Sequence, residues 1–163
     1  MESTSLSSRR GLGGFAALAG GALMIVSVFL PWIGDMTGWD SVNTDITSIR
    51  STGDFFKNPA FADSGFSPFF TGLTILIAGG LMVLIGLAML ASLRGGAFRL
   101  PGAGMFVLAL LGVLIAIVGV TNLPSLYATG PAGVNPAYGL FLLTAGALVG
   151  FLGVVAGIGR GRS

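Results

Sequence analysis

Four long apolar stretches, each free of ionisable residues, alternate with polar segments along this chain. They lie at 12–31, 69–93, 100–121 and 136–158. An α-helix rises about 1.5 Å per residue, so about 20 residues cross a hydrocarbon layer about 30 Å thick. The pattern therefore predicts an all-α integral membrane protein whose four transmembrane helices form a bundle. The segments left outside the helices are 1–11, 32–68, 94–99, 122–135 and 159–163.

The composition supports a membrane protein and removes several kinds of site. Only 9% of the 163 residues are charged and the mean hydropathy is +0.93, whereas a soluble domain carries about 25% charged residues. The chain contains no Cys and no His. Disulfides, thiolate nucleophiles, iron–sulfur clusters and the usual zinc sites are therefore excluded, and no cofactor is expected.

The basic residues predict the orientation in the membrane. Most of them precede the first stretch, follow the fourth, or separate the second from the third: Arg9, Arg10, Arg94, Arg99, Arg160 and Arg162. Because basic residues are enriched on the cytoplasmic side, both termini are expected in the cytoplasm of a multi-pass plasma (inner) membrane protein. Segment 32–68 is then a large first extracytoplasmic loop. The basic residues form no stripe, so nucleic-acid binding is not expected.

The amino terminus has one competing interpretation. Segment 8–12 partly matches a twin-arginine export signal. Segment 17–19 has the small residues of a cleavage site but comes too early, and Pro31 and Trp32 follow the apolar stretch where such a site is needed. We therefore expect the first helix to remain uncleaved.

Glycine is frequent in the apolar stretches, at spacings of four and seven residues that place successive glycines on one helix face. Small residues on such faces let membrane helices approach closely. The glycines expected on packing faces are Gly13, Gly20, Gly21, Gly79, Gly86, Gly112, Gly119, Gly139, Gly146, Gly150, Gly153 and Gly157. The spacing does not distinguish contacts within the bundle from contacts with another chain. A general Gly and Ala bias of the composition is the alternative explanation.

An ionisable side chain within a span is the usual mark of an ion or proton pathway, and the four stretches contain none. Their hydroxyl-bearing residues are Ser27, Thr71, Thr74, Ser92, Thr121 and Thr144. Such side chains bond to their own helix backbone without any further role. A proton-coupled transporter and an intramembrane hydrolase are therefore not expected. An apolar pore built from several copies and a neutral channel remain open.

The first extracytoplasmic loop is the predicted working surface, because it is long and rich in aromatic and acidic residues. The residues expected to form a cap or to meet a partner are Trp39, Asp40, Phe55, Phe56 and Phe61. Apolar and hydroxyl residues alternate over 41–51, which predicts a short β-ribbon. Asp35, Asp40 and Asp45 are candidates for a cation site, but their spacing differs from a calcium loop. A solvated acidic face is the favoured interpretation.

Aromatic residues at the ends of the stretches are expected to anchor the helices at the lipid headgroups. These residues are Trp32, Phe69, Phe70, Tyr127 and Tyr138. The second extracytoplasmic segment, 122–135, contains two prolines and two glycines and is expected to form a compact turn.

Two resemblances follow from these features. Four spans with internal termini and a first outer loop containing Trp32 and Gly38-Trp39 resemble the layout of claudin-like tetraspan proteins, although the cysteine pair of claudins is missing. The chain also resembles small, Ala/Gly-rich four-span proteins of actinobacteria that carry Leu-Pro-Trp at the first outer boundary, here Leu30-Pro31-Trp32. The second resemblance implies an accessory subunit of a respiratory or envelope complex.

The sequence therefore favours a noncatalytic accessory or scaffold subunit, and not an enzyme. Its expected partners are the lipid bilayer and other membrane protein subunits or further copies of itself, met through glycine-rich helix faces and the aromatic, acidic loop. A small transporter, channel or lipid-handling protein is the alternative. Outer-loop carboxylates such as Asp35 with Asp40 or Asp54 also permit an acid/base pair, but no nucleophile or substrate-binding partner accompanies them.

Overall fold

The computed structural model describes residues 2–40, 72–93, 102–129 and 135–158. Its elements are α1 (Glu2–Val28), β1 (Pro31–Ile33), β2 (Met36–Thr37), α3 (Gly72–Ala91), α4 (Gly102–Thr129) and α5 (Tyr138–Ile158). Each helix contains a stretch long and apolar enough to cross a membrane, namely Arg10–Val28, Gly72–Ala91, Phe106–Pro124 and Tyr138–Gly157. The prediction of four such helices is confirmed.

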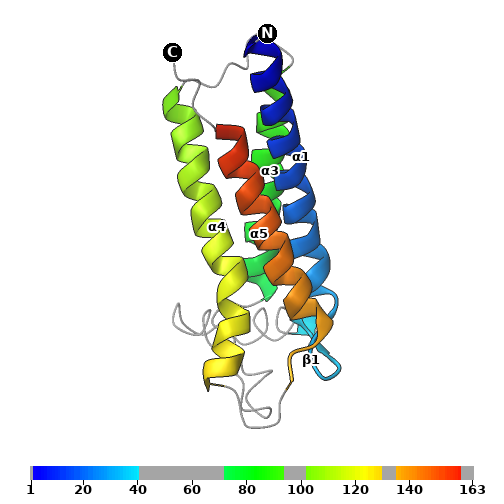
Figure 1. Ribbon diagram of the computed structural model, residues 1–163. Helices are drawn as coiled ribbons and strands as arrows, with labels where there is room; N and C mark the ends of the chain where they lie inside the picture. Colours follow the sequence, from blue (N-terminus) through cyan, green and yellow to red (C-terminus); the bar gives the residue numbers. More distant parts are fainter. Residues whose placement is uncertain (1, 41–71, 94–101, 130–134, 159–163) are drawn as a thin grey trace.

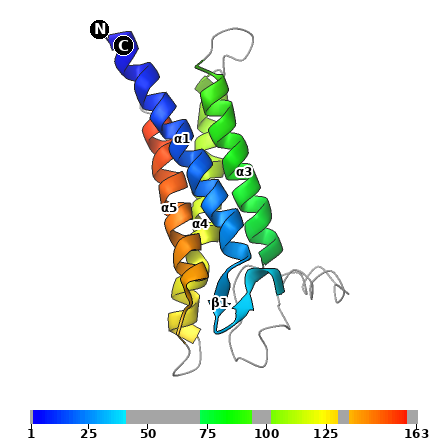
Figure 2. The same ribbon diagram turned by 90° about the vertical axis from the view of Figure 1, so that its right-hand side faces the viewer.

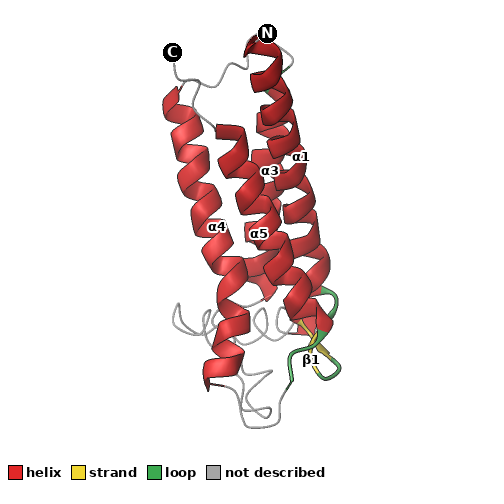
Figure 3. Cartoon of the chain, in the orientation of Figure 1, coloured by secondary structure: helices red, strands yellow, loops and turns green. Residues whose placement is uncertain are grey.

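The helices run alternately up and down, so that α1 begins and α5 ends at the same end of the bundle (Figure 1). α1 lies between α3 and α5 and packs closely against both of them (Figure 2). α4 packs mainly against α5 and more lightly against α3. At the opposite end of the bundle, β1 and β2 form a small antiparallel ribbon (Figure 3). We call this end of the bundle the ribbon end.

Two glycine pairs allow α1 to approach both of its neighbours. Gly13 and Gly20 face α5, and a Cβ added at either position would lie 2.5 Å from a backbone oxygen of that helix. Gly14 and Gly21 face α3, where a Cβ at Gly21 would lie 2.7 Å from the oxygen of Gly79. The pairs are seven residues apart, about two helical turns, so each face repeats along the helix. Only residues without a side chain permit backbones to approach this closely.

Buried methionines fill the space between helices that do not touch through their backbones. Met82 of α3 lies against Gly150 of α5, and Met24 of α1 lies against Gly119 of α4. Both methionines are fully buried. The long, unbranched thioether side chain adapts to irregular space, so each methionine reaches across the bundle to a glycine on the far helix.

The least buried of the four spans is that of α4. Side chains of the bundle bury 28% of this span, against 44% for the spans of α1 and α5. The large apolar side chains that α4 exposes are Phe106, Val107, Leu110, Val113, Leu114, Ile117 and Tyr127. In water such a surface would drive aggregation, whereas in a bilayer it is the surface that faces lipid.

α4 extends beyond its predicted end. Residues 122–129 belong to the helix, although 122–135 was expected to form a turn because of its prolines. Pro124 lacks an N–H and cannot donate to the carbonyl of Val120. Membrane helices tolerate this loss because neighbouring groups and local adjustments satisfy the backbone. Nearby, the hydroxyl of Thr121 donates to the carbonyl of Ile117 at 2.5 Å.

The first span also differs from its predicted bounds. α1 begins at Glu2 rather than at residue 12, and it ends at Val28, before Pro31. Bonds from Phe29 N to Val26 O and from Leu30 N to Ser27 O tighten its last turn. The chain then enters β1 directly, so a ribbon is present at 31–37. The ribbon predicted for 41–51 lies outside the described residues.

The close approach of α1 and α3 gives a matched pair of substitutions within one helix. A Cβ at Gly86 would lie 2.6 Å from Leu18 N and 2.8 Å from Gly14 O of α1, whereas a Cβ at Gly80 would meet nothing within 4 Å. We expect Gly86→Ala to force the helices apart and to lower the stability by about 1–3 kcal/mol, the usual cost of overpacking. Gly80→Ala should leave the stability unchanged or raise it by up to about 1 kcal/mol through helix propensity.

Thermal unfolding of both variants in the same mild detergent measures this difference. Equal midpoints for Gly86→Ala and Gly80→Ala would contradict the packing of α1 against α3.

Candidate functional site

Trp32 is the central residue of the ribbon end. Its side chain is 0% exposed, and the indole Nε1 donates to the carbonyl oxygen of Ser27 at 2.8 Å. A Cβ at Gly38 would lie 2.6 Å from Cζ2 of the ring, and one at Gly139 would lie 3.0 Å from Cδ1. The ring therefore sits in a close-fitting space with glycines at both of its ends. The prediction that Trp32 anchors the protein at the headgroups does not fit this burial.

The ribbon joins the end of α1 to the start of α5. Ala137 N donates to Trp32 O at 2.8 Å, and Ile33 forms a β-bridge with Pro136. β1 and β2 are connected through Gly34, whose φ of +54° favours glycine. Because these contacts link residues more than one hundred positions apart in the sequence, the ribbon fixes the two helix ends relative to each other.

A capping box lies at the start of the helical residues 38–40. Thr37 N and Oγ1 both donate to the Oδ2 of Asp40, at 2.8 and 2.9 Å, and Asp40 N donates back to Thr37 Oγ1 at 3.3 Å. This reciprocal pattern satisfies the free donors of a helix start. Asp40 was predicted to meet a partner, and the structure gives its carboxylate a local role in shaping the cap.

Trp39 lies on the outside of this cap. It is 40% exposed, and it packs on the exposed ring of Phe29 with ring centroids 5.3 Å apart. Asp35 in the ribbon turn and Asp40 beside Trp39 are both exposed. An exposed indole thus packs on a second aromatic ring, with acidic groups near it in the sequence. We refer to Trp39, Phe29, Asp35 and Asp40 as the cap surface.

Other predicted loop residues cannot be placed on this surface. Phe55, Phe56, Phe61, Phe69 and Phe70 lie outside the described residues, as does Asp45 of the candidate cation site. Within the described residues, no group of three or more potential metal ligands comes together. Tyr127 and Tyr138 are exposed, 68% and 61%, near the ribbon end of α4 and at the start of α5, where an interfacial anchor would stand.

All the glycines predicted on packing faces meet another element of the same chain. They are Gly13, Gly20, Gly21, Gly79, Gly86, Gly112, Gly119, Gly139, Gly146, Gly150, Gly153 and Gly157. The sequence left open whether such faces would meet another chain. In the structure the bundle itself covers them, so a partner would have to use other surfaces.

The hydroxyl groups within the helices bond to their own backbone at four of the predicted positions. Ser27 and Ser92 donate to the carbonyls of Met24 and Met89, each at 2.6 Å. The corresponding bonds of the threonines are Thr121 to Ile117 and Thr144 to Leu140. The prediction of local back-bonding is confirmed at these positions. A hydroxyl that donates its proton to a backbone carbonyl of its own helix has no donor left for a solute that crosses the membrane.

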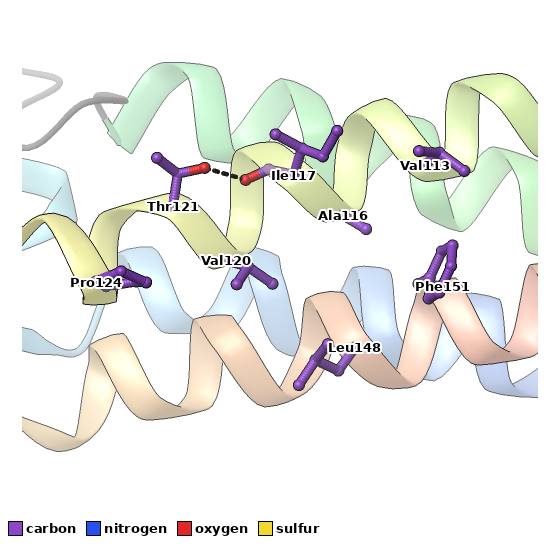
Figure 4. A pocket seen from close by; sticks show the side chains of 8 residues that line it. All are labelled: Val113, Ala116, Ile117, Val120, Thr121, Pro124, Leu148 and Phe151. Carbon is purple, nitrogen blue, oxygen red and sulfur yellow. Dashed lines mark hydrogen bonds between the residues drawn. The ribbon is translucent and has the colours of Figure 1, made fainter.

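An apolar groove lies between α4 and α5 on the outside of the bundle. It has a volume of about 610 Å³, and its lining is almost wholly apolar: Val113, Ala116, Ile117, Val120, Thr121, Pro124, Leu148 and Phe151. Figure 4 shows Leu148 and Phe151 projecting from α5 beside the side chains of α4. The hydroxyl of Thr121, the one polar side chain of the lining, is bonded to Ile117 O. The groove therefore offers an apolar surface whose one side-chain donor is already used within α4.

The sequence did not predict three features of the ribbon end and of the α4–α5 groove. The burial of Trp32 depends on Gly38 and Gly139, which no local pattern connects. Asn122, placed in the predicted turn, is fully buried in α4. The groove arises from the spacing of two helices, and the only sequence signal near it is Pro124 within an otherwise apolar helix.

No known protein family, curated protein or solved structure is detectably similar to this chain.

Trp32 and Trp39 are the only tryptophans of the chain. The solvent exposure of each can therefore be measured by fluorescence in a variant that lacks the other. In Trp39→Phe the remaining Trp32 should be shielded from acrylamide, whereas in Trp32→Phe the remaining Trp39 should be quenched readily. We also expect Trp32→Phe to lower the stability by about 1–3 kcal/mol, through the lost hydrogen bond and unfilled space. Trp39→Phe serves as the control and should change the stability by less than about 0.5 kcal/mol.

Fluorescence quenching and thermal unfolding in detergent measure the two effects. Similar quenching of Trp32 and Trp39 would contradict the burial of Trp32.

Proposed function

We propose that this chain is a noncatalytic accessory or scaffold subunit of a membrane protein complex, of the respiratory or envelope type. The observation that carries the proposal is the cap surface, where an exposed indole packs on the ring of Phe29 and lies in the chain between the two capping-box residues Thr37 and Asp40. Tryptophan is enriched among the residues that dominate protein–protein binding energy. A pre-ordered surface binds at a lower entropic cost than a flexible one.

The glycine faces take a different role in this proposal from the one the sequence suggested. Because α1, α3, α4 and α5 cover these faces within the bundle, the partner contacts are assigned to the cap surface. The bundle then serves as a membrane platform that holds the cap at one face of the bilayer. The absence of ionisable residues from the four apolar stretches of the sequence also supports a platform rather than an ion pathway.

The proposal places the ribbon end outside the cytoplasm of a plasma (inner) membrane. The support for this orientation is the clustering of arginines at both termini and at segment 94–99. The start of α1 and the end of α5 lie at one end of the bundle (Figure 1), as that orientation requires.

The orientation is testable with single cysteines, because the chain has none of its own. Asp35→Cys is expected to react with a membrane-impermeant maleimide in intact cells. Ser163→Cys should react only after the membrane is opened. Labelling of Ser163→Cys in intact cells would reverse the proposed orientation.

Partner binding is testable by purification from the native membrane in mild detergent. We expect defined protein partners to copurify with the chain, and we expect Trp39→Ala to reduce their recovery about tenfold or more, as for other binding hot spots. Phe106→Ala is the matched control, since it removes an exposed aromatic ring near the start of α4, at the opposite end of the bundle from the cap surface (Figure 1). A chain that is monomeric and free of partners, or partner recovery unaffected by Trp39→Ala, would overturn the proposal.

A small transporter, channel or lipid-handling protein is the second candidate. One observation favours lipid handling, namely the apolar groove between α4 and α5. Lipid transfer or ion flux through purified protein in liposomes would support this function. Absence of both at high protein density would remove it.

A further inference from the structure

We infer that the groove between α4 and α5 is a binding site for one acyl chain of a membrane lipid, in the leaflet at the ribbon end. The inference deepens the second candidate function, lipid handling, which rests on the same groove, and it is separate from the accessory-subunit proposal. A bound lipid that is never transferred would support the site and remove the lipid-handling function. It rests on the position of the groove, its length, its lining and the residue at its outer mouth.

The position of the groove limits what can enter it. The groove opens sideways, between two helices whose outer faces carry exposed apolar side chains such as Ile117 and Leu148. In a bilayer these faces contact hydrocarbon and not water. The occupant must therefore already be dissolved in the membrane, which leaves lipid tails and transmembrane helices.

The length of the groove matches one leaflet. Its lining on α4 runs from Val113 to Pro124, which is about 17 Å of helix at 1.5 Å per residue. Half of a hydrocarbon core about 30 Å thick is about 15 Å. Pro124 is also the last residue of the candidate membrane span of α4, which is defined by length and composition. In a bilayer centred on that span, the groove would extend from the membrane boundary to about the midplane. A lipid tail has this extent, whereas a transmembrane helix would continue across the other half.

The lining fits a flexible chain better than a helix. Close packing of membrane helices relies on small residues, and only Ala116 and Thr121 of the eight lining residues belong to that class. The branched and ring side chains, such as Val120 and Phe151, leave an irregular apolar surface. A volume of about 610 Å³ lies within the range of about 300–1,000 Å³ that is usual for small-molecule sites. A flexible hydrocarbon chain can follow such a surface without requiring a hydrogen bond.

The outer mouth of the groove lies where a headgroup would be. Tyr127 follows Pro124 by three residues and Val120 by seven, so all three lie on the same face of α4. Its ring is 68% exposed, and tyrosine is enriched at the level of lipid headgroups. Tyr127 is therefore placed to contact the glycerol or headgroup region of a lipid whose tail occupies the groove.

The test uses purified protein in phosphatidylcholine vesicles that contain a minor fraction of a phosphatidylcholine with a photoactivatable diazirine in its tail. After illumination, mass spectrometry of peptides locates the labelled residues. We expect label to concentrate on residues 113–124 and 148–151. Even labelling of all the exposed apolar faces would overturn the inference, because it would mean only the ordinary lipid shell.

A matched pair on α5 separates the groove from the rest of the surface. Leu148 lines the groove and is 47% exposed, whereas Leu152, one turn further along, is 62% exposed and is not part of the lining. We expect Leu148→Trp to fill the groove and to lower its labelling about tenfold, as several methylene groups lose their apolar contacts. Leu152→Trp should leave the labelling unchanged. Equal labelling in both variants would contradict the site.

Native mass spectrometry of the unmodified chain gives a reading that does not depend on either variant folding. We expect one tightly held phospholipid per chain after mild detergent extraction. A dimer or a copurifying helical protein whose contacts protect 113–124 from label would instead identify the occupant as a transmembrane helix, and would overturn the inference.

Discussion

The backbone of α1 lies directly against the backbones of both α3 and α5, and the rest of the bundle is arranged around this double contact. Gly13 and Gly20 form one contact face, and Gly14 and Gly21 form the other. In lipid the hydrophobic effect does not drive helices together, so dispersion between closely spaced backbones supplies much of the attraction. A helix with glycine on two adjacent faces can gain this attraction twice, which explains why α1 lies between two neighbours.

The position of α4 follows from the same constraint. Gly112 and Gly119 of α4 meet side chains of α5, those of Val154 and Ala147, whereas the nearest neighbours of Gly13, Gly20 and Gly21 of α1 are backbone atoms. α4 therefore packs at a distance set by side chains, and its span remains the least buried of the four. The groove beside Pro124 is a consequence of this looser packing. α5 therefore has two faces with different roles: its glycines pack on α1, whereas Leu148 and Phe151 line the groove beside α4.

The fold was more predictable from the sequence than the candidate site was. The helices depend on local patterns, whereas the site depends on contacts between residues far apart in the sequence. Apolar length and glycine spacing are local properties, and they predicted four apolar helices and the residues at which the helices meet. Trp32 was misassigned because Leu30-Pro31-Trp32 at the end of a span has the pattern of a membrane boundary. Its burial requires Gly139, which is distant in sequence. Pro124 was read as a breaker because in water its lost hydrogen bond would usually end a helix.

The burial of Trp32 also explains how a loop residue can have a fixed position on a membrane protein. Its indole bonds to Ser27 O at the end of α1, and its backbone oxygen accepts from Ala137 N, next to α5. One residue thus couples the ribbon to two helices that are themselves held together by glycine contacts. Gly38 must remain a glycine to accommodate the ring, and Trp39 follows it directly. The position of the exposed indole is therefore determined by the buried one, and any partner that binds Trp39 meets a surface whose ordering cost was met when the bundle folded.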